Sequence, residues 1–320
     1  MQKCEYVGPS GQHCSEEAQD GKSVCIWHDR EADKSEIDIK EHLEHKARAM
    51  ESCEGYELYR ANLEDAFIIE LDLSYANLER ANLRDASAFS VNLTGANLLK
   101  ADLRDSNLRE AKLKDADLLG ANLDGADLDR ADWGDNTILR SHKIAMDLTA
   151  QGDAIGAQMK YQEAEDTYLI IRQRYESSGM TDTAGQFFYN GMVCKRMQMP
   201  KWSVNRFWSK LVDIICGYGE DPLRVIGCSL AVVIGCALIF CLTGMSHGGN
   251  VYAFNFEITI AEDLRTFGFA LYYSIVTFTT LGYGDMVALG WGKGLAAMEA
   301  FIGVFLNSIF LLTFAKKMIR

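Results

Sequence analysis

Four residues near the N-terminus have the types and spacing of metal ligands. Cys4, Cys14, Cys25 and His28 follow the pattern C-x9-C-x10-C-x2-H. Thiolates and imidazoles bind zinc tetrahedrally, and the closing Cys-x-x-His turn lets two ligands meet one ion. Four protein ligands leave no open position for catalysis, so the spacing predicts a structural Zn2+ site. Unrelated reduced cysteines are the alternative, and His13 is an alternative fourth ligand.

A glycine-rich run near the C-terminus is the second candidate functional site in the sequence. Residues 279–285 are Thr-Thr-Leu-Gly-Tyr-Gly-Asp. Gly282 and Gly284 permit backbone angles that other residues avoid, and such angles can aim successive carbonyl oxygens inward. Backbone carbonyl oxygens aimed at one point can replace the water shell of a cation. The run therefore predicts an ion-binding site made from the backbone.

Two apolar segments flank this run, and each is long enough to cross a membrane. Residues 225–243 carry no charge, and a second apolar segment follows the run. A helix needs roughly 20 residues to span the hydrocarbon core, so we expect spans at about residues 223–244 and 295–315. Residues 264–280 are too short to cross. They predict a re-entrant helix that continues into the glycine-rich loop, together at about residues 264–285.

The segment from Ala270 to Asp285 resembles the pore helix and signature sequence of potassium channels. It reads Ala-Leu-Tyr-Tyr-Ser-Ile-Val-Thr-Phe-Thr-Thr-Leu-Gly-Tyr-Gly-Asp, and the architecture matches over about residues 202–318. The resemblance implies a K+-selective, all-α, two-span channel that assembles as a homotetramer in the lipid bilayer of the plasma membrane. Leu281 departs from the commoner Val or Ile, and the proline often found after the aspartate is absent. The resemblance also implies the filter residues, which are Thr280, Leu281, Gly282, Tyr283 and Gly284.

Three residues of the second predicted span share one helix face. Glu299, Gly303 and Asn307 lie four residues apart. Residues 299–303 and 314–318 resemble the inner helix of inward-rectifier potassium channels. The resemblance implies that all three residues belong to the pore and gate, with the gate near Gly303 and Asn307 facing the aqueous cavity. Those channels continue into a cytoplasmic β-sandwich, whereas this sequence stops soon after the span. It also has no arginine-rich voltage-sensing helix, so gating input is expected from the N-terminal side.

The segment before the first span predicts the orientation of the chain. Residues 203–216 combine Phe207 and Trp208 with basic side chains, which is typical of a helix lying on the membrane surface. Basic residues flank the same ends of both spans, so both termini are expected in the cytoplasm. The N-terminus is polar and has no cleavable apolar segment, so the cysteines are expected to be reduced.

An internal repeat occupies residues 53–136. From Leu63 to Leu128 every fifth residue is leucine except Ile68 and Ala88, and the residue two positions earlier is usually alanine. A period of five fits neither helix nor strand, so the chain must turn a corner in every unit. The pattern A-(N/D)-L-x-x resembles the pentapeptide-repeat family, which implies a right-handed four-sided β-helix. Some members mimic DNA and bind topoisomerases, so a membrane-anchored interaction protein is the alternative function; a rigid spacer or assembly surface is the simpler role.

The sequence therefore predicts a mixed fold with a soluble part and a membrane part. The net charge of −13 argues against binding to nucleic acid. No nucleophile, acid/base pair or open metal site supports an enzyme. The predicted parts are a zinc-binding module at residues 1–30, a helical connector at 31–52, the β-helix at 53–136, a pair of antiparallel helices at 137–200, and the interfacial helix with the pore domain at 201–320.

Overall fold

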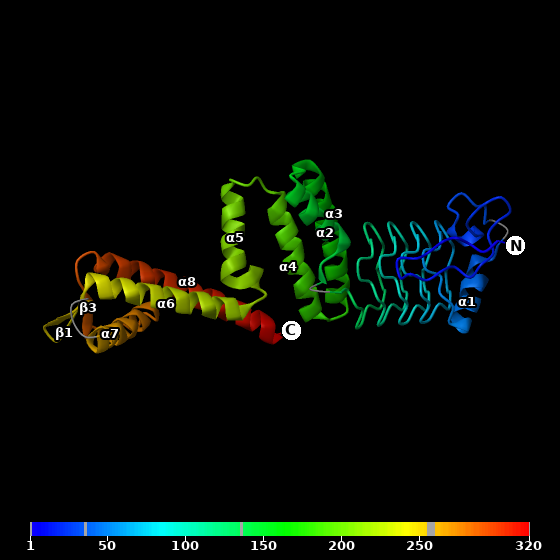
Figure 1. Ribbon diagram of the computed structural model, residues 1–320. Helices are drawn as coiled ribbons and strands as arrows, with labels where there is room; N and C mark the ends of the chain where they lie inside the picture. The colour runs from blue at the N-terminus through cyan, green and yellow to red at the C-terminus, as the bar shows by residue number, and fades with distance from the viewer. Residues whose placement is uncertain (1, 35–36, 135–136, 255–259, 320) are drawn as a thin grey trace. The chain divides into compact units, whose positions relative to one another are not determined.

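The structure is a computed structural model that describes residues 2–34, 37–134, 137–254 and 260–319 (Figure 1). The chain forms two compact units, Met1–Arg206 and Phe207–Arg320. Each unit is described separately below.

In the repeat region, each five-residue unit turns one corner of a coil. Arg60, Asp65 and Glu70, one in each successive unit, have left-handed φ angles of 56°, 55° and 55°. Parallel bridges join residues one coil apart, such as Glu57 with Asn77. Four units therefore make one coil, as the resemblance to pentapeptide repeats implies.

A polar residue that recurs in most of the repeat units explains why the coils stack. Asn77 Oδ1 accepts a hydrogen bond of 3.3 Å from the Glu79 amide. This bond stabilises the turn that contains both residues. The same Oδ1 accepts a bond of 3.1 Å from the Asn97 side chain in the next coil. Backbone bonds such as Leu58 N–H to Asn77 O, at 2.8 Å, run between the same coils. Asn or Asp at this position thus serves both the corner and the ladder.

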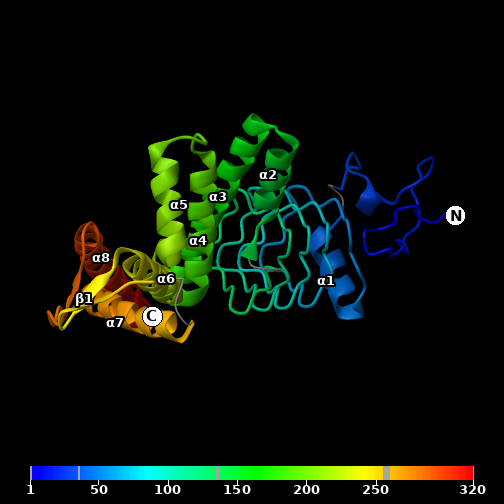
Figure 2. The same cartoon turned by 60° about the vertical axis from the view of Figure 1, so that its left-hand side comes forward.

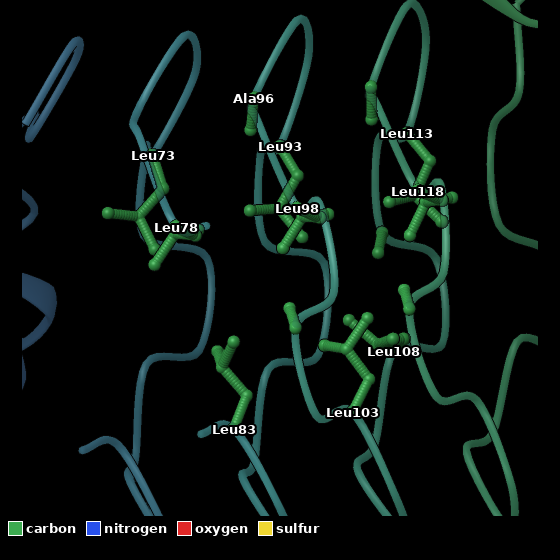
Figure 3. Packing of buried hydrophobic residues seen from close by; sticks show 14 of the residues in the cluster. Leu73, Leu78, Leu83, Leu93, Ala96, Leu98, Leu103, Leu108, Leu113 and Leu118 are labelled. Carbon is green, nitrogen blue, oxygen red and sulfur yellow. The ribbon is translucent and has the colours of Figure 1, made fainter. Parts of the chain in front are cut away.

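Leucine and alanine side chains fill the interior of the coils. Burying one leucine side chain contributes about 1.5–3 kcal/mol, and the repeat does this once per unit. Alanine at the second inward position leaves room for these leucines. Figure 3 shows equivalent leucines of successive coils stacked in rows, one of Leu73, Leu93 and Leu113 and another of Leu78, Leu98 and Leu118; all six are fully or almost fully buried.

Helix α1 covers the N-terminal end of the β-helix (Figure 2). It spans Ile39–Ala49 and begins at Asp38, whose side chain accepts a bond from the Glu41 amide. Glu44 accepts a 3.1 Å bond from the Phe67 amide, and Lys40 donates to the Glu64 carbonyl at 2.7 Å. These side chains pair backbone groups of the outermost coil that would otherwise form an open edge.

The C-terminal end is covered by helices α2 (Arg140–Gln151), α3 (Ala154–Ser177) and α4 (Thr181–Gln198). The Tyr175 hydroxyl of α3 donates to the Leu128 carbonyl of the last coil at 3.1 Å and accepts from Trp133 Nε1 at 2.8 Å. The sequence predicts two helices here, but the structure has three. Helix α2 buries only His142 and Ala145, so it lacks the apolar period that marks α3.

Among its described residues, the second unit has four α-helices, the 3-10 helix Gly217–Gly219 and a small sheet. Helix α5 spans Val204–Cys216, α6 spans Pro222–Thr243, α7 spans Ile260–Phe278 and α8 spans Gly292–Ile319. Strands β1 (Met245–His247), β2 (Asn250–Tyr252) and β3 (Met286–Ala288) pair antiparallel in the order β2-β1-β3. Because β3 follows the glycine-rich loop, the sheet ties the end of that loop to the segment after α6.

Helices α6 and α8 are long and apolar enough to cross a membrane. Helix α6 begins at Asp221, whose side chain accepts from the Leu223 amide at 3.0 Å, and Pro222 occupies its first turn. It ends at Gly244, which has a φ of 82°. Helix α7 carries Glu262 and Asp263 in its first turn, so its apolar part is shorter than a span.

Candidate functional site

The glycine-rich loop leaves the C-terminal end of α7 with an alternating backbone. Thr280, Gly282 and Gly284 have φ angles of 58°, 51° and 78°, whereas Leu281 and Tyr283 between them are not left-handed. A left-handed φ is uncommon for a β-branched residue such as Thr280, and strain of this kind concentrates at functional sites. The alternation covers the run in which the sequence predicts the ion ligands.

Hydrogen bonds hold both ends of this loop. At its start, the Leu281 amide donates to the Val276 carbonyl of α7 at 3.0 Å. At its end, Asp285 accepts a 3.0 Å bond from the Tyr272 hydroxyl, and its carbonyl lies 2.9 Å from His247 Nδ1. A carbonyl only accepts, so His247 Nδ1 carries the hydrogen. The loop is therefore fastened to helix α7 and to β1.

Behind the loop, a buried polar contact joins three helices. The Ser274 hydroxyl on α7 lies 2.8 Å from the Val233 carbonyl of α6 and in short contact with the Glu299 carboxyl of α8. Ser274 and Glu299 are both 0% exposed. A hydroxyl has one hydrogen for these two acceptors. If it goes to Val233, Glu299 must itself donate to Ser274 and is then a neutral acid.

Glu299 Oε2 supports this protonation state. By hydrogen-bond geometry it has no partner among the residues that the structure describes, and the Cys236 thiol of α6 is a weak donor beside the carboxyl. Burying an ionised carboxylate without pairing costs far more than burying a neutral acid. The sequence places Glu299 with the pore and gate, whereas the structure buries it against α7. The four-residue spacing defines a helix face but not the element that covers the face.

Gly303 lies on the same face, one turn further along α8. A Cβ at this position would lie 2.0 Å from the Phe278 carbonyl oxygen. Glycine here permits α8 to approach the backbone of α7 at the residue before the loop. Asn307 is exposed in the protomer and lines an apolar cavity of about 550 Å³ with residues of α6 and α7, including Ser229 and Ile275.

Helix α5 carries the exposed apolar face expected of a helix on a membrane surface. Val204, Phe207, Trp208 and Ile214 are all more than half exposed. Salt bridges join the neighbouring segments. The buried Asp213 of α5 pairs with Arg224 of α6 at 3.1 Å, and Lys316 near the end of α8 pairs with Glu220.

The four predicted metal ligands come together in the first unit. The ligand atoms of Cys4, Cys14, Cys25 and His28 all lie within 4.8 Å of one another. His13 is exposed and is not part of this cluster.

Family comparisons divide the chain in the same way. Residues 227–320 match the model of a family described as an ion channel. Residues 57–105, 89–123 and 101–132 match pentapeptide repeats, with 8 copies. The chain belongs to the pentapeptide-repeat family through residues 57–132, and residues 227–320 are similar to ion-channel domains. Neither family consists of enzymes.

Solved structures similar to the chain are pentapeptide-repeat proteins. Alr5209 from Nostoc PCC 7120 is 42% identical, with 28% of this chain and 76% of that chain covered and a TM-score of 0.28. Rfr23 from Cyanothece 51142 is 34% identical over 26% of this chain and 52% of its own, with a TM-score of 0.21. The Arabidopsis thaliana thylakoid-lumen protein AT2G44920 is 29% identical over 24% and 50%, with a TM-score of 0.15. The chain therefore spans about half the length of the last two. A comparison with curated proteins found no match.

Sequence reasoning missed Ser274, Tyr272 and His247. A signal was available for Ser274, because a hydroxyl in an otherwise apolar helix needs a partner when buried. The Tyr272 and His247 contacts join segments that are distant in the sequence, and no local pattern marks them.

Proposed function

We propose that this membrane protein is a potassium-selective channel that assembles as a homotetramer in the plasma membrane, with both termini in the cytoplasm. The observation that carries the proposal is the alternating backbone at Thr280, Gly282 and Gly284, directly after the re-entrant helix α7. Such a loop can present successive carbonyl oxygens to a dehydrated cation. The carbonyls of residues 280–284, with the Thr280 hydroxyl, are the proposed K+ ligands.

The exposure of the protomer supports assembly with further copies. Leu281 and Tyr283 are 59% and 66% exposed, although both are large apolar or aromatic side chains of the proposed filter. Only 17% of the most apolar 18-residue stretch of α8 is buried within the protomer, compared with 33% of that of α6. Neighbouring subunits would cover these surfaces, and four copies of the loop would close a ring around the ion path. In this tetramer Asn307, one helical turn after Gly303, would face the water-filled cavity of the ion path.

Potassium flux tests the proposal. The full chain, purified and reconstituted into liposomes, should pass K+ in strong preference to Na+. Gly282→Ala should abolish the flux because alanine resists the left-handed angle of 51° that the loop requires. The space around Gly282 is open, so a steric clash within the protomer is not the cause.

Gly268→Ala is the matched control. Gly268 is in the body of α7, its φ is helical and nothing lies within 4 Å of an added Cβ. This variant should retain selective flux. Selective flux through Gly282→Ala would overturn the filter assignment. No K+ flux through the wild-type chain would favour the alternative, a membrane-anchored interaction protein built on the pentapeptide repeats.

A further inference from the structure

The Cys/His cluster of the first unit has the dimensions of a tetrahedral zinc site. A Zn–S distance of about 2.3 Å and a Zn–N distance of about 2.0 Å give tetrahedral edges of roughly 3.8 Å between sulfurs and 3.5 Å between sulfur and nitrogen. Cys14 Sγ and Cys25 Sγ are 3.8 Å apart. His28 Nδ1 lies 3.7 Å from Cys4 Sγ and 3.2 Å from Cys25 Sγ. We propose that these four residues bind one structural Zn2+, which fastens the N-terminal module to the first coil of the β-helix.

The sulfurs are placed as separate ligands rather than as a disulfide. A disulfide needs sulfurs about 2.05 Å apart, which is far shorter than the 3.8 Å between Cys14 and Cys25. The Cys25 amide donates to Cys4 Sγ at 3.2 Å. The amides of Trp27 and His28 in turn face the Cys25 sulfur. Backbone donors of this kind stabilise the negative sulfur of a metal-bound cysteine.

The second nitrogen of His28 connects the metal site to the β-helix. His28 Nε2 lies 2.8 Å from the carbonyl oxygen of Glu54, which accepts its hydrogen. Nε2 therefore carries the hydrogen and Nδ1 has its lone pair directed into the cluster, as a metal ligand requires. The Tyr6 ring stacks on the imidazole with centroids 3.8 Å apart, and Tyr56 packs against its edge. These contacts fix the ring in the orientation for binding.

The turn that carries His28 takes the place of a missing coil. Within the β-helix, the amide of Asn77 donates to the Tyr56 carbonyl of the preceding coil. The equivalent amide of the first coil, that of Glu57, donates instead to the Trp27 carbonyl at 2.7 Å. A metal bound through Cys25 and His28 holds this short turn, Ile26–His28, in the place that terminates the ladder.

The module has few other means to remain folded. Between residues 2 and 34, the fully or nearly buried apolar side chains are Cys4, Cys25 and Trp27. A segment of this size cannot bury enough apolar surface to fold alone, so metal binding would supply much of its stability. Zinc loss should therefore loosen both the module and the first coil.

Metal analysis and hydrogen exchange of the full chain in detergent test the proposal. Elemental analysis of wild-type protein should find about one zinc per chain. Cys25→Ser should lose the zinc and accelerate exchange of the Glu57 amide, while amides of the middle coils, near Leu93, stay protected. Treating wild-type protein with a zinc chelator should give the same pattern, which keeps the test decisive if the variant does not fold. Cys228→Ser, which alters a cysteine of α6 outside the cluster, should keep its zinc.

His28→Cys separates two roles of His28: binding the metal, and holding the Ile26–His28 turn against the first coil. A fourth thiolate can replace the imidazole as a zinc ligand, but it has no second donor for the Glu54 carbonyl. The variant should retain zinc and still show faster exchange around Glu57. Wild-type protein without stoichiometric zinc, or with iron in its place, would overturn the site. Unchanged Glu57 exchange after zinc removal would overturn its role as a cap.

Discussion

Gly303→Ala is the most direct test of how α8 packs on α7. The added Cβ would lie 2.0 Å from the carbonyl oxygen, 2.9 Å from the carbonyl carbon and 3.2 Å from the Cα of Phe278. All three atoms are backbone, so no side chain can rotate away. The contact can be relieved only by moving α8 or the end of α7, where the proposed filter begins.

The magnitude follows from two opposing terms. Overpacking a buried contact costs about 1–3 kcal/mol, and a backbone clash this severe belongs at the upper end. Replacing glycine by alanine within a helix stabilises the helix by about 1 kcal/mol. The net loss is therefore about 2 kcal/mol for each subunit, and a homotetramer would contain four such contacts.

Thermal unfolding in detergent and K+ flux in liposomes measure the two consequences. Gly303→Ala should unfold several degrees below wild type and should lose selective flux. Gly294→Ala lies in the same helix with nothing within 4 Å of its added Cβ, so it should match or exceed wild-type stability. If Gly303 is only a hinge, Gly303→Ala would unfold like Gly294→Ala and change gating alone. That result would refute the packing argument.

Three further predictions concern buried or tethered groups. If Glu299 is a neutral acid, Glu299→Gln should conduct like wild type and Glu299→Leu should not; a Gln variant as inactive as the Leu variant would mean that the carboxyl is ionised. Tyr272→Phe removes the donor to Asp285, so K+/Na+ selectivity measured from reversal potentials should fall, and unchanged selectivity would contradict a role for that bond. Burial lowers the pKa of His142 from 6.5 to about 4. The unfolded chain therefore takes up a proton between these pH values while the folded chain does not, and the free energy of unfolding should fall by up to about 3 kcal/mol as pH drops from 6.5 towards 4. Urea unfolding at pH 7 and 4.5 should show a smaller drop for His142→Gln than for wild type, and equal drops would exclude His142 as the cause.

The parts of the fold that could be predicted from the sequence are those with local rules. The five-residue repeat determines where the chain turns and which leucines point inward. It also places residues such as Asn77 one above another in successive coils. All of these follow because each unit repeats the same contacts. The two spans follow from length and absence of charge. The Cys4 to His28 spacing predicted a cluster because a Cys-x-x-His turn brings two ligands together by itself.

The parts that could not be predicted depend on which elements meet. Periodicity placed Glu299, Gly303 and Asn307 on one face of α8, but only tertiary packing shows that Glu299 and Gly303 contact α7. Helix α2 was missed because its buried face is small and holds a histidine. The Tyr272 bond to Asp285 closes a loop whose two ends carry no shared pattern.

The capped ends of the β-helix limit how the repeats can take part in assembly. At one end, Glu44 and the Trp27 carbonyl pair amides of the first coil; at the other, Tyr175 pairs the Leu128 carbonyl. An added coil from a second copy would have to displace these contacts. In the proposed tetramer, the repeat domains therefore cannot extend one another end to end. Any contact between copies, or with a partner, must use the sides of the coils, where backbone groups are already paired and outward side chains decide specificity.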